Sequence, residues 1–150
     1  MLFRTHILFS LAVYFFLRDF LPMSIWVLFF VLLAAAFVDV DIGKSKIGNH
    51  WFFRPLQWLT KHRGFLHSLG ASILFSLIVA SFSRWAGIGF FIGYISHLFL
   101  DCLTKAGVYL FWPFKWKVRG FIRSGGIFED VIFSLLFLWD GFIVARNIGF

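Results

Sequence analysis

The chain has almost no cysteine, since Cys102 is the only one among its 150 residues. A single cysteine excludes an internal disulfide framework and any CxxC metal site. Charged residues are also scarce, at 14% of the chain, whereas 61% of the residues are hydrophobic. An ordinary soluble domain has about 45–50% apolar residues. The composition therefore excludes that class and indicates a membrane protein.

Several sequence signals are missing as well. There is no HExxH motif, which argues against a zincin-type protease. There is no internal repeat and no low-complexity linker, and the length fits one domain. The first apolar segment has a basic start at Arg4 but no small-residue cleavage site after it, so we expect it to be retained.

The apolar residues are grouped in blocks that approach the roughly 20 residues a helix needs to cross a bilayer. We predict an all-α, polytopic membrane helical bundle with about five transmembrane helices. The expected spans are about Phe3–Leu17, Phe20–Val38, Phe65–Phe82, Trp85–Leu103 and Val131–Val144. Pro22 suits the first turn of the second span. The stretch WFFRPLQWLTK is too interrupted to span, and its aromatic residues predict an interfacial segment.

Lysine and arginine are distributed unevenly between the two membrane faces that these spans define. The face that holds the N-terminus receives eleven of them: Arg4, Lys44, Lys46, Arg54, Lys61, Arg63, Lys105, Lys115, Lys117, Arg119 and Arg123. The opposite face receives Arg18, Arg84 and Arg146. By the positive-inside rule the N-terminal face is cytoplasmic, which predicts a multi-pass protein of the cytoplasmic (inner) membrane. The net charge of +7 then reflects topology, and we expect no nucleic-acid partner.

The histidines and most of the acids gather on the same face. They are His6, His50, His62, His67 and His97, with Asp39, Asp41, Asp101, Glu129 and Asp130. Ionisable groups at membrane depth are costly and usually face one another in an interior cavity. Neutral imidazoles and carboxylates are ligands for divalent metals, so this face is a candidate metal site.

The spacing of these residues supports a shared site. His97 and Asp101 are four apart, which places both on one face of the fourth span. Gly89 and Gly93 form a GxxxG pattern on roughly that face, and such a pattern allows a neighbouring helix to approach closely.

Two further pairs depend on the local backbone. Asp39 and Asp41 would point the same way if the chain were extended there. The five-residue spacing of His62 and His67 is poor for one helix face. Gly64 can interrupt the helix, however, so that His62 reaches back from a loop while His67 sits in the first turn.

Three features have interpretations that involve neither metal binding nor catalysis. His50 has no partner at a useful spacing and fits a polar anchor at the membrane interface. The basic run Lys115–Arg123 fits a topological, lipid-facing segment. Asp140 could simply pair with Arg18 or Arg84.

Three stretches together resemble a known family: HRGFLHS, GYISHLFLDCLTKAGVYLFWPF, and a glutamate before the last span. They are similar to the YdjM-type membrane-bound metal-dependent hydrolases, also described as LexA-binding, inner-membrane-associated hydrolases. The resemblance implies an all-helical membrane protein and, through a distant likeness to zinc phospholipase C, a phosphoester hydrolase occupying residues 1–150. It implies these metal ligands: His6, Asp39, Asp41, His62, His67, His97, Asp101 and Glu129.

These residues predict metal-assisted hydrolysis, in which two or more divalent ions, with zinc as the first choice, activate water for attack on a phosphorus or acyl centre. Arg63 would hold the phosphate with its planar guanidinium. Asp39 or Glu129 would be a general base rather than a ligand. A site at the cytoplasmic membrane surface suits a phospholipid or another lipid phosphate as substrate.

Two other functional classes of membrane protein use some of the same residue types. Membrane phosphatases with a histidine nucleophile require Ser-Gly-His, which is absent, and Arg84 falls on the face opposite His97. A non-enzymatic protein with a structural or transport-related metal site is the remaining alternative. A structural zinc site is closed by four ligands, fewer than the eight candidates, and no broken-helix pair indicates a transporter.

Overall fold

The computed structural model describes residues 1–22, 24–41 and 64–148, with the main chain alone at residues 41, 147 and 148. Within these ranges the chain is helical and has no strand beyond two isolated β-bridges. The α-helices are α1 (Phe3–Phe16), α2 (Ile25–Phe37), α4 (Leu69–Ala80), α5 (Arg84–Leu103) and α6 (Ile127–Ile148), and two 3-10 helices are η1 (Val38–Asp41) and η3 (Phe65–His67). The all-α prediction is confirmed for this part of the chain.

The described helices agree with the five predicted spans in number and position. By length and composition, α5, with 20 residues, is the one helix in the described ranges that is able to cross a membrane on its own. The apolar helices at Phe3–Phe16, Ile25–Val40 and Leu69–Ala80 are shorter. Five separate membrane crossings therefore stay a prediction. The predicted interfacial segment lies outside the described residues.

Helix α2 begins later than the second predicted span. Its N-cap is Ser24, whose side-chain oxygen accepts a hydrogen bond from the main-chain N–H of Trp26 at 3.3 Å. A serine at this position satisfies an amide that has no partner within the helix, which fixes the helix start. The predicted place of Pro22 in the first helical turn is therefore wrong, because Pro22 precedes the cap.

The stretch VDVD continues α2 as the 3-10 helix η1. The extended conformation considered for Asp39 and Asp41 is therefore wrong. A 3-10 helix has about three residues per turn, so side chains two positions apart point in different directions. The side chain of Asp39 reaches the site described below, and the side chain of Asp41 lies outside the described part.

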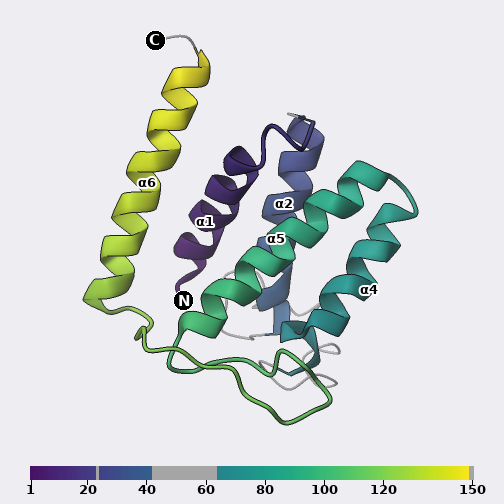
Figure 1. The fold of residues 1–150 in the computed structure, drawn as a ribbon, viewed down its shortest axis with the longest axis vertical. Coiled ribbons are helices and arrows are strands. Elements are labelled where there is room, and N and C mark those ends of the chain that lie inside the picture. The colour runs from purple at the N-terminus through teal and green to yellow at the C-terminus, as the bar shows by residue number, and fades with distance from the viewer. Residues whose placement is uncertain (23, 42–63, 149–150) are drawn as a thin grey trace.

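Helix α5 runs through the middle of the bundle, where it contacts α1, α2 and α4, while α6 packs against α1 (Figure 1). The close approach of α2 depends on two glycines of α5. A Cβ atom at Gly93 would overlap the carbonyl oxygen of Val31, and one at Gly89 would lie 2.9 Å from the carbonyl oxygen of Val27. The GxxxG pattern thus has the packing role that the sequence predicted.

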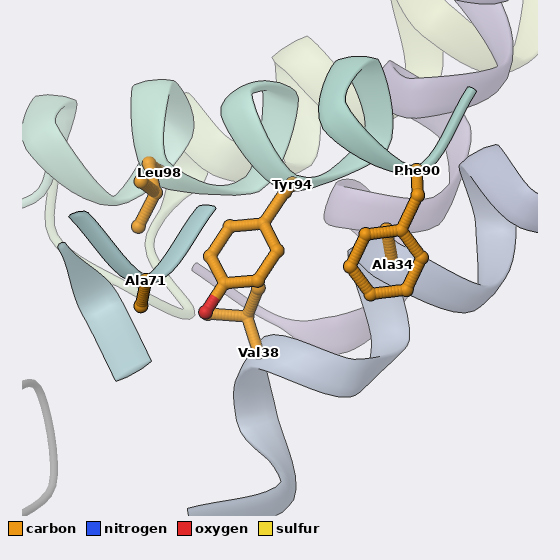
Figure 2. Packing of buried hydrophobic residues seen from close by; sticks show 6 residues of the cluster. All are labelled: Ala34, Val38, Ala71, Phe90, Tyr94 and Leu98. Carbon is orange, nitrogen blue, oxygen red and sulfur yellow. The ribbon is translucent and has the colours of Figure 1, made fainter. Parts of the chain in front are cut away.

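A buried apolar cluster joins α2, α4 and α5 (Figure 2). It consists of Ala34, Val38, Ala71, Phe90, Tyr94 and Leu98. Tyr94 is fully buried, and its hydroxyl donates a hydrogen bond to the carbonyl oxygen of Leu66 in η3. This bond fixes η3, and with it His67, against α5.

Five helix ends meet at one end of the bundle, which we call the cluster end (Figure 1). They are the N-terminal ends of α1, α4 and α6 and the C-terminal ends of α2 and α5. These are the ends that the five-span topology places on one membrane face. The order and direction of the helices along the chain therefore bring together polar side chains that are far apart in the sequence.

Candidate metal centre

Five of the predicted ligands converge at the cluster end. His6 comes from α1, Asp39 from η1, His67 from η3, and His97 and Asp101 from α5. All five are buried, with Asp39 the most exposed at 9% and both His67 and His97 at 0%. Burying so many ionisable groups together is costly unless they bind one another or a shared ion.

Two histidines and two aspartates lie close to one another. His67 Nε2 lies 3.5 Å from Asp101 Oδ2 and 3.9 Å from Asp39 Oδ1. His97 Nε2 lies 3.7 Å from Asp101 Oδ2 and 3.6 Å from Asp39 Oδ1. In a tetrahedral zinc site with bonds of about 2.0–2.2 Å, neighbouring donor atoms are about 3.3–3.6 Å apart. These four separations are close to those around a bound zinc ion, and the donors of Asp39, His67 and His97 all lie within 4.8 Å of one another.

The ring of His97 is held in the orientation that a metal ligand needs. Its Nδ1 lies 2.7 Å from the carbonyl oxygen of Ala35 in α2. A carbonyl only accepts, so Nδ1 donates and Nε2 of the neutral ring keeps its lone pair. Nε2 has no hydrogen-bond partner among the described residues. Gly93 makes this possible, because it allows α2 close enough for Ala35 to reach the ring.

His6 extends the cluster on the other side of Asp101. Its ring stacks on His97 with a centroid distance of 3.8 Å and an interplanar angle of 6°. Its Nε2 lies 3.5 Å from Asp101 Oδ1, the oxygen that also contacts the Met1 main-chain nitrogen at 2.9 Å. Asp101 thus directs Oδ1 toward His6 and Oδ2 toward His67 and His97.

The donors can also be divided into two overlapping triads. One contains His6, His97 and Asp101, and the other Asp39, His67 and His97. One imidazole nitrogen offers a single lone pair, so the two triads cannot each use His97 Nε2 for an ion of its own. Any second ion must instead share the carboxylate of Asp101 and draw further donors from elsewhere.

Glu129 is buried nearby but lies in neither triad. Its carboxylate accepts hydrogen bonds from the main-chain N–H of Leu2, the hydroxyl of Thr5 at 2.9 Å and the main-chain N–H of Gly125 at 2.6 Å. Burial tends to raise the pKa of Glu129, but these hydrogen bonds outweigh it and hold the pKa below its usual range. In this structure Glu129 joins the start of α6 to the start of α1, next to His6.

The remaining predicted site residues are not placed. His62 and Arg63 lie outside the described residues, as does the side chain of Asp41. His50, which is interpreted as a polar anchor and not as a ligand, lies outside them too. Two supporting groups were not predicted, namely the Ala35 carbonyl and the Thr5 hydroxyl. A main-chain carbonyl leaves no trace in a sequence. Thr5 precedes His6 directly, and that proximity is the only signal that could have drawn attention to it.

Comparison with known proteins gives a match along nearly the whole chain. The family model described as YdjM inner membrane protein matches residues 1–149. The chain is 35% identical over 123 residues to the inner membrane protein YdjM of Escherichia coli (strain K12) and equally to that of Shigella flexneri. Each match covers 73% of this chain and 62% of the relative, so the chain spans about three-fifths of the length of these curated relatives. No solved structure matches significantly. The chain belongs to the YdjM inner membrane protein family.

Proposed function

We propose that this protein is a metal-dependent hydrolase of the inner membrane that cleaves a phosphoester bond of a lipid. The observation that carries the proposal is the convergence of three histidines and two aspartates from four separate elements into one buried cluster. Membership in a family of inner membrane proteins supports the location. The cluster end holds most of the described basic residues, which supports a site at the cytoplasmic surface.

The described residues fit a divalent ion. His67, His97 and Asp101 would hold it, Asp39 would lie beside it, and His6 with the second oxygen of Asp101 would extend the site. When bound there, zinc supplies Lewis-acid activation of water and of a phosphoryl oxygen. Nε2 of buried His97 has no hydrogen-bond partner in the part of the chain that the structure describes. This is the strongest sign of the role, because an unpartnered buried nitrogen is otherwise costly.

Asp39 is the member of the cluster best suited to accept a proton from water. Its side chain is 13% exposed, whereas that of Asp101 is 3% exposed and those of His67 and His97 are fully buried. Water therefore reaches Asp39 most easily. Glu129 suits this role less well, because its oxygens already accept three hydrogen bonds.

The phosphate group would be held by Arg63, whose planar guanidinium binds two oxygens at once. Arg63 lies outside the described residues, but Gly64 follows it directly and leads into η3. Its main chain is thus three peptide bonds from buried Leu66 and four from His67.

A hydrolysis screen tests the proposal. The full chain, purified in detergent, is incubated with a defined phospholipid mixture, and products are identified by mass spectrometry. We expect cleavage that stops on chelation and returns when zinc or manganese is added. Arg63→Lys should keep its metal but lose activity by about 100-fold or more, because the lost guanidinium would bind negative charge in the transition state. The matched variant Arg54→Lys should retain activity. Metal-loaded protein that cleaves nothing, or chelated protein that cleaves equally well, would reject the proposal.

A structural metal site is the second candidate, and one observation favours it. The donors of two histidines and two aspartates lie close together, and all four binding one ion would complete a four-coordinate site, as in closed structural zinc sites. In that case chelation would lower the melting temperature while the loaded protein cleaved no lipid. The same purified samples therefore separate the two functions.

A further inference from the structure

The segment between α5 and α6 folds back on itself at the cluster end (Figure 1). Thr104 pairs with Ile122 and Val108 with Val118 in isolated β-bridges. The main-chain N–H groups of Val108 and Val118 donate to each other's carbonyl oxygens, both at 2.9 Å. We call residues 104–126 the platform.

Two glycines pack the platform tightly. Gly107 has a φ angle of +61°, and a Cβ atom there would overlap the carbonyl oxygen of Val118. A Cβ atom at Gly120 would overlap the carbonyl oxygen of Leu103. The two arms are therefore in direct main-chain contact with each other and with the end of α5, which makes the platform a preformed surface.

The platform is also attached to the segment that carries His67. The main-chain N–H of Leu69 donates to the carbonyl oxygen of Leu110 at 2.9 Å. The rings of Phe65 and Trp112 meet edge to face, with centroids 5.2 Å apart. The platform begins three residues after Asp101. It thus lies beside the metal-binding cluster.

Its outer surface combines aromatic rings with positive charge. Phe114, Trp116 and Phe121 are 70%, 77% and 73% exposed. The basic residues interleaved with them, Lys115, Lys117, Arg119 and Arg123, are exposed too. The sequence contains no Asp or Glu between Asp101 and Glu129, so nothing within the platform neutralises this charge.

We infer that the platform binds anionic phospholipid at the membrane surface beside the cluster. Exposed tryptophan and phenylalanine favour the membrane interface, and lysine and arginine attract anionic lipid by about 1 kcal/mol each. Nucleic acid would satisfy the charge, but the alternation of large rings with cations in an inner-membrane family fits lipid better. That the bound lipid is also the substrate rests on the proposed function, whereas binding itself does not.

Lipid competition tests the inference. The purified full chain is mixed with equal amounts of phosphatidylglycerol and phosphatidylethanolamine, and retained lipid is counted by native mass spectrometry, intact or cleaved. Binding is thereby measured whether or not hydrolysis occurs. We expect a preference for phosphatidylglycerol in the wild type. It should fall by about 100-fold in Lys115→Gln/Arg119→Gln/Arg123→Gln, since each of the three charges is worth about fivefold. The matched control, Arg18→Gln/Arg84→Gln/Arg146→Gln, removes three charges from the other end and should keep the preference.

Each other result overturns the inference. An equal loss in both triple variants would mean that total charge, not the platform, selects the lipid. An unchanged preference in the platform variant would place the lipid elsewhere. Displacement of the lipid by mixed-sequence single-stranded RNA would favour nucleic acid. If the triple variant does not run as a monodisperse species, Lys115→Gln alone should still lower the preference about fivefold.

Discussion

At the scale of single residues, Glu129 allows direct metal binding to be separated from support of a neighbouring ligand. Its carboxylate holds the start of α1 through Leu2 and Thr5. We expect Thr5→Val to weaken zinc binding by about tenfold, because groups that orient a ligand are typically worth 10–100-fold in affinity and Thr5 adjoins His6. Competition with a chromogenic zinc chelator measures the change. Thr5→Ser keeps the hydroxyl and should bind as wild type does.

The opposite pattern would assign Glu129 to the metal itself. In that case Glu129→Gln would lose zinc while Thr5→Val kept its full affinity. Both variants alter the hydrogen bond between Thr5 and Glu129. A supporting role of Glu129 therefore predicts weaker zinc binding in both variants, whereas a ligand role predicts a loss in Glu129→Gln alone.

Asp140 is a second residue with an unusual environment. It is 4% exposed, and neither carboxylate oxygen has a hydrogen-bond partner in the described part of the chain. The pairing considered with Arg18 or Arg84 is not seen there, since Arg18 contacts Asp19 at 3.7 Å and Arg84 lies over the ring of Trp85. A buried carboxyl group without a partner costs stability.

Replacing this group should therefore stabilise the fold. We expect Asp140→Leu to raise the melting temperature in detergent by about 2 °C or more. The control is Asp19→Leu, because the Asp19 side chain is 81% exposed and should change little. A lower melting temperature for Asp140→Leu would show that the carboxyl group has a partner that α6 requires.

At the scale of secondary structure elements, the contact between α2 and α5 sets the geometry of the cluster. Gly93→Ala places a methyl group on the carbonyl oxygen of Val31 and forces the helices apart. Overpacking typically costs 1–3 kcal/mol, so we expect a clear fall in melting temperature. Zinc affinity should fall with it, because Asp39 follows α2 and His97 lies one turn after Gly93.

The matched control for this variant is Gly141→Ala in α6. A Cβ atom there meets nothing within 4 Å, and alanine is the better helix former. Gly141→Ala should therefore leave stability equal or higher. Equal behaviour of the two variants would contradict close α2–α5 packing as the basis of the site.

The elements themselves were largely predictable. Long apolar blocks predicted the five α-helices in the described part of the chain, because burial or lipid contact stabilises uninterrupted apolar sequence as helices. The start of α2 was missed because one hydroxyl, that of Ser24, sets it. The 3-10 helix at Asp39 was missed because aspartate pairs carry no strong local preference, and tertiary packing decides their conformation.

At the scale of the whole molecule, the sequence predicted that histidines and acids meet at one end, but not how they meet. Helix count and order were enough for His6, Asp39, His67, His97 and Asp101 to share that end. The stacking of His6 on His97 depends on helix rotation and separation. Those are set by packing around Gly93 and Tyr94, which a pattern of apolar residues does not encode.

Topology is the prediction that belongs to this scale. Five crossings place Lys46 in the cytoplasm and Phe150 outside, from the eleven-to-three distribution of basic residues. Reporter fusions after Lys46 and after Phe150 should read opposite sides, and one after Ser83 should agree with Phe150. If Lys46 and Phe150 report the same side, the number of crossings between them is even and the shared cytoplasmic face is lost.

The most direct measurement of the central claim is the metal content of the purified protein. Wild type, His97→Ala and His50→Ala are prepared in detergent, checked for monodispersity and analysed for metals by mass spectrometry. We predict at least one divalent ion per wild-type chain and a loss of most of it in His97→Ala. His50→Ala removes a histidine that is not among the predicted ligands, so it should keep the wild-type metal content. The account would be contradicted by a wild-type protein that holds no metal after zinc loading. It would also be contradicted if His97→Ala kept its metal while His50→Ala lost it.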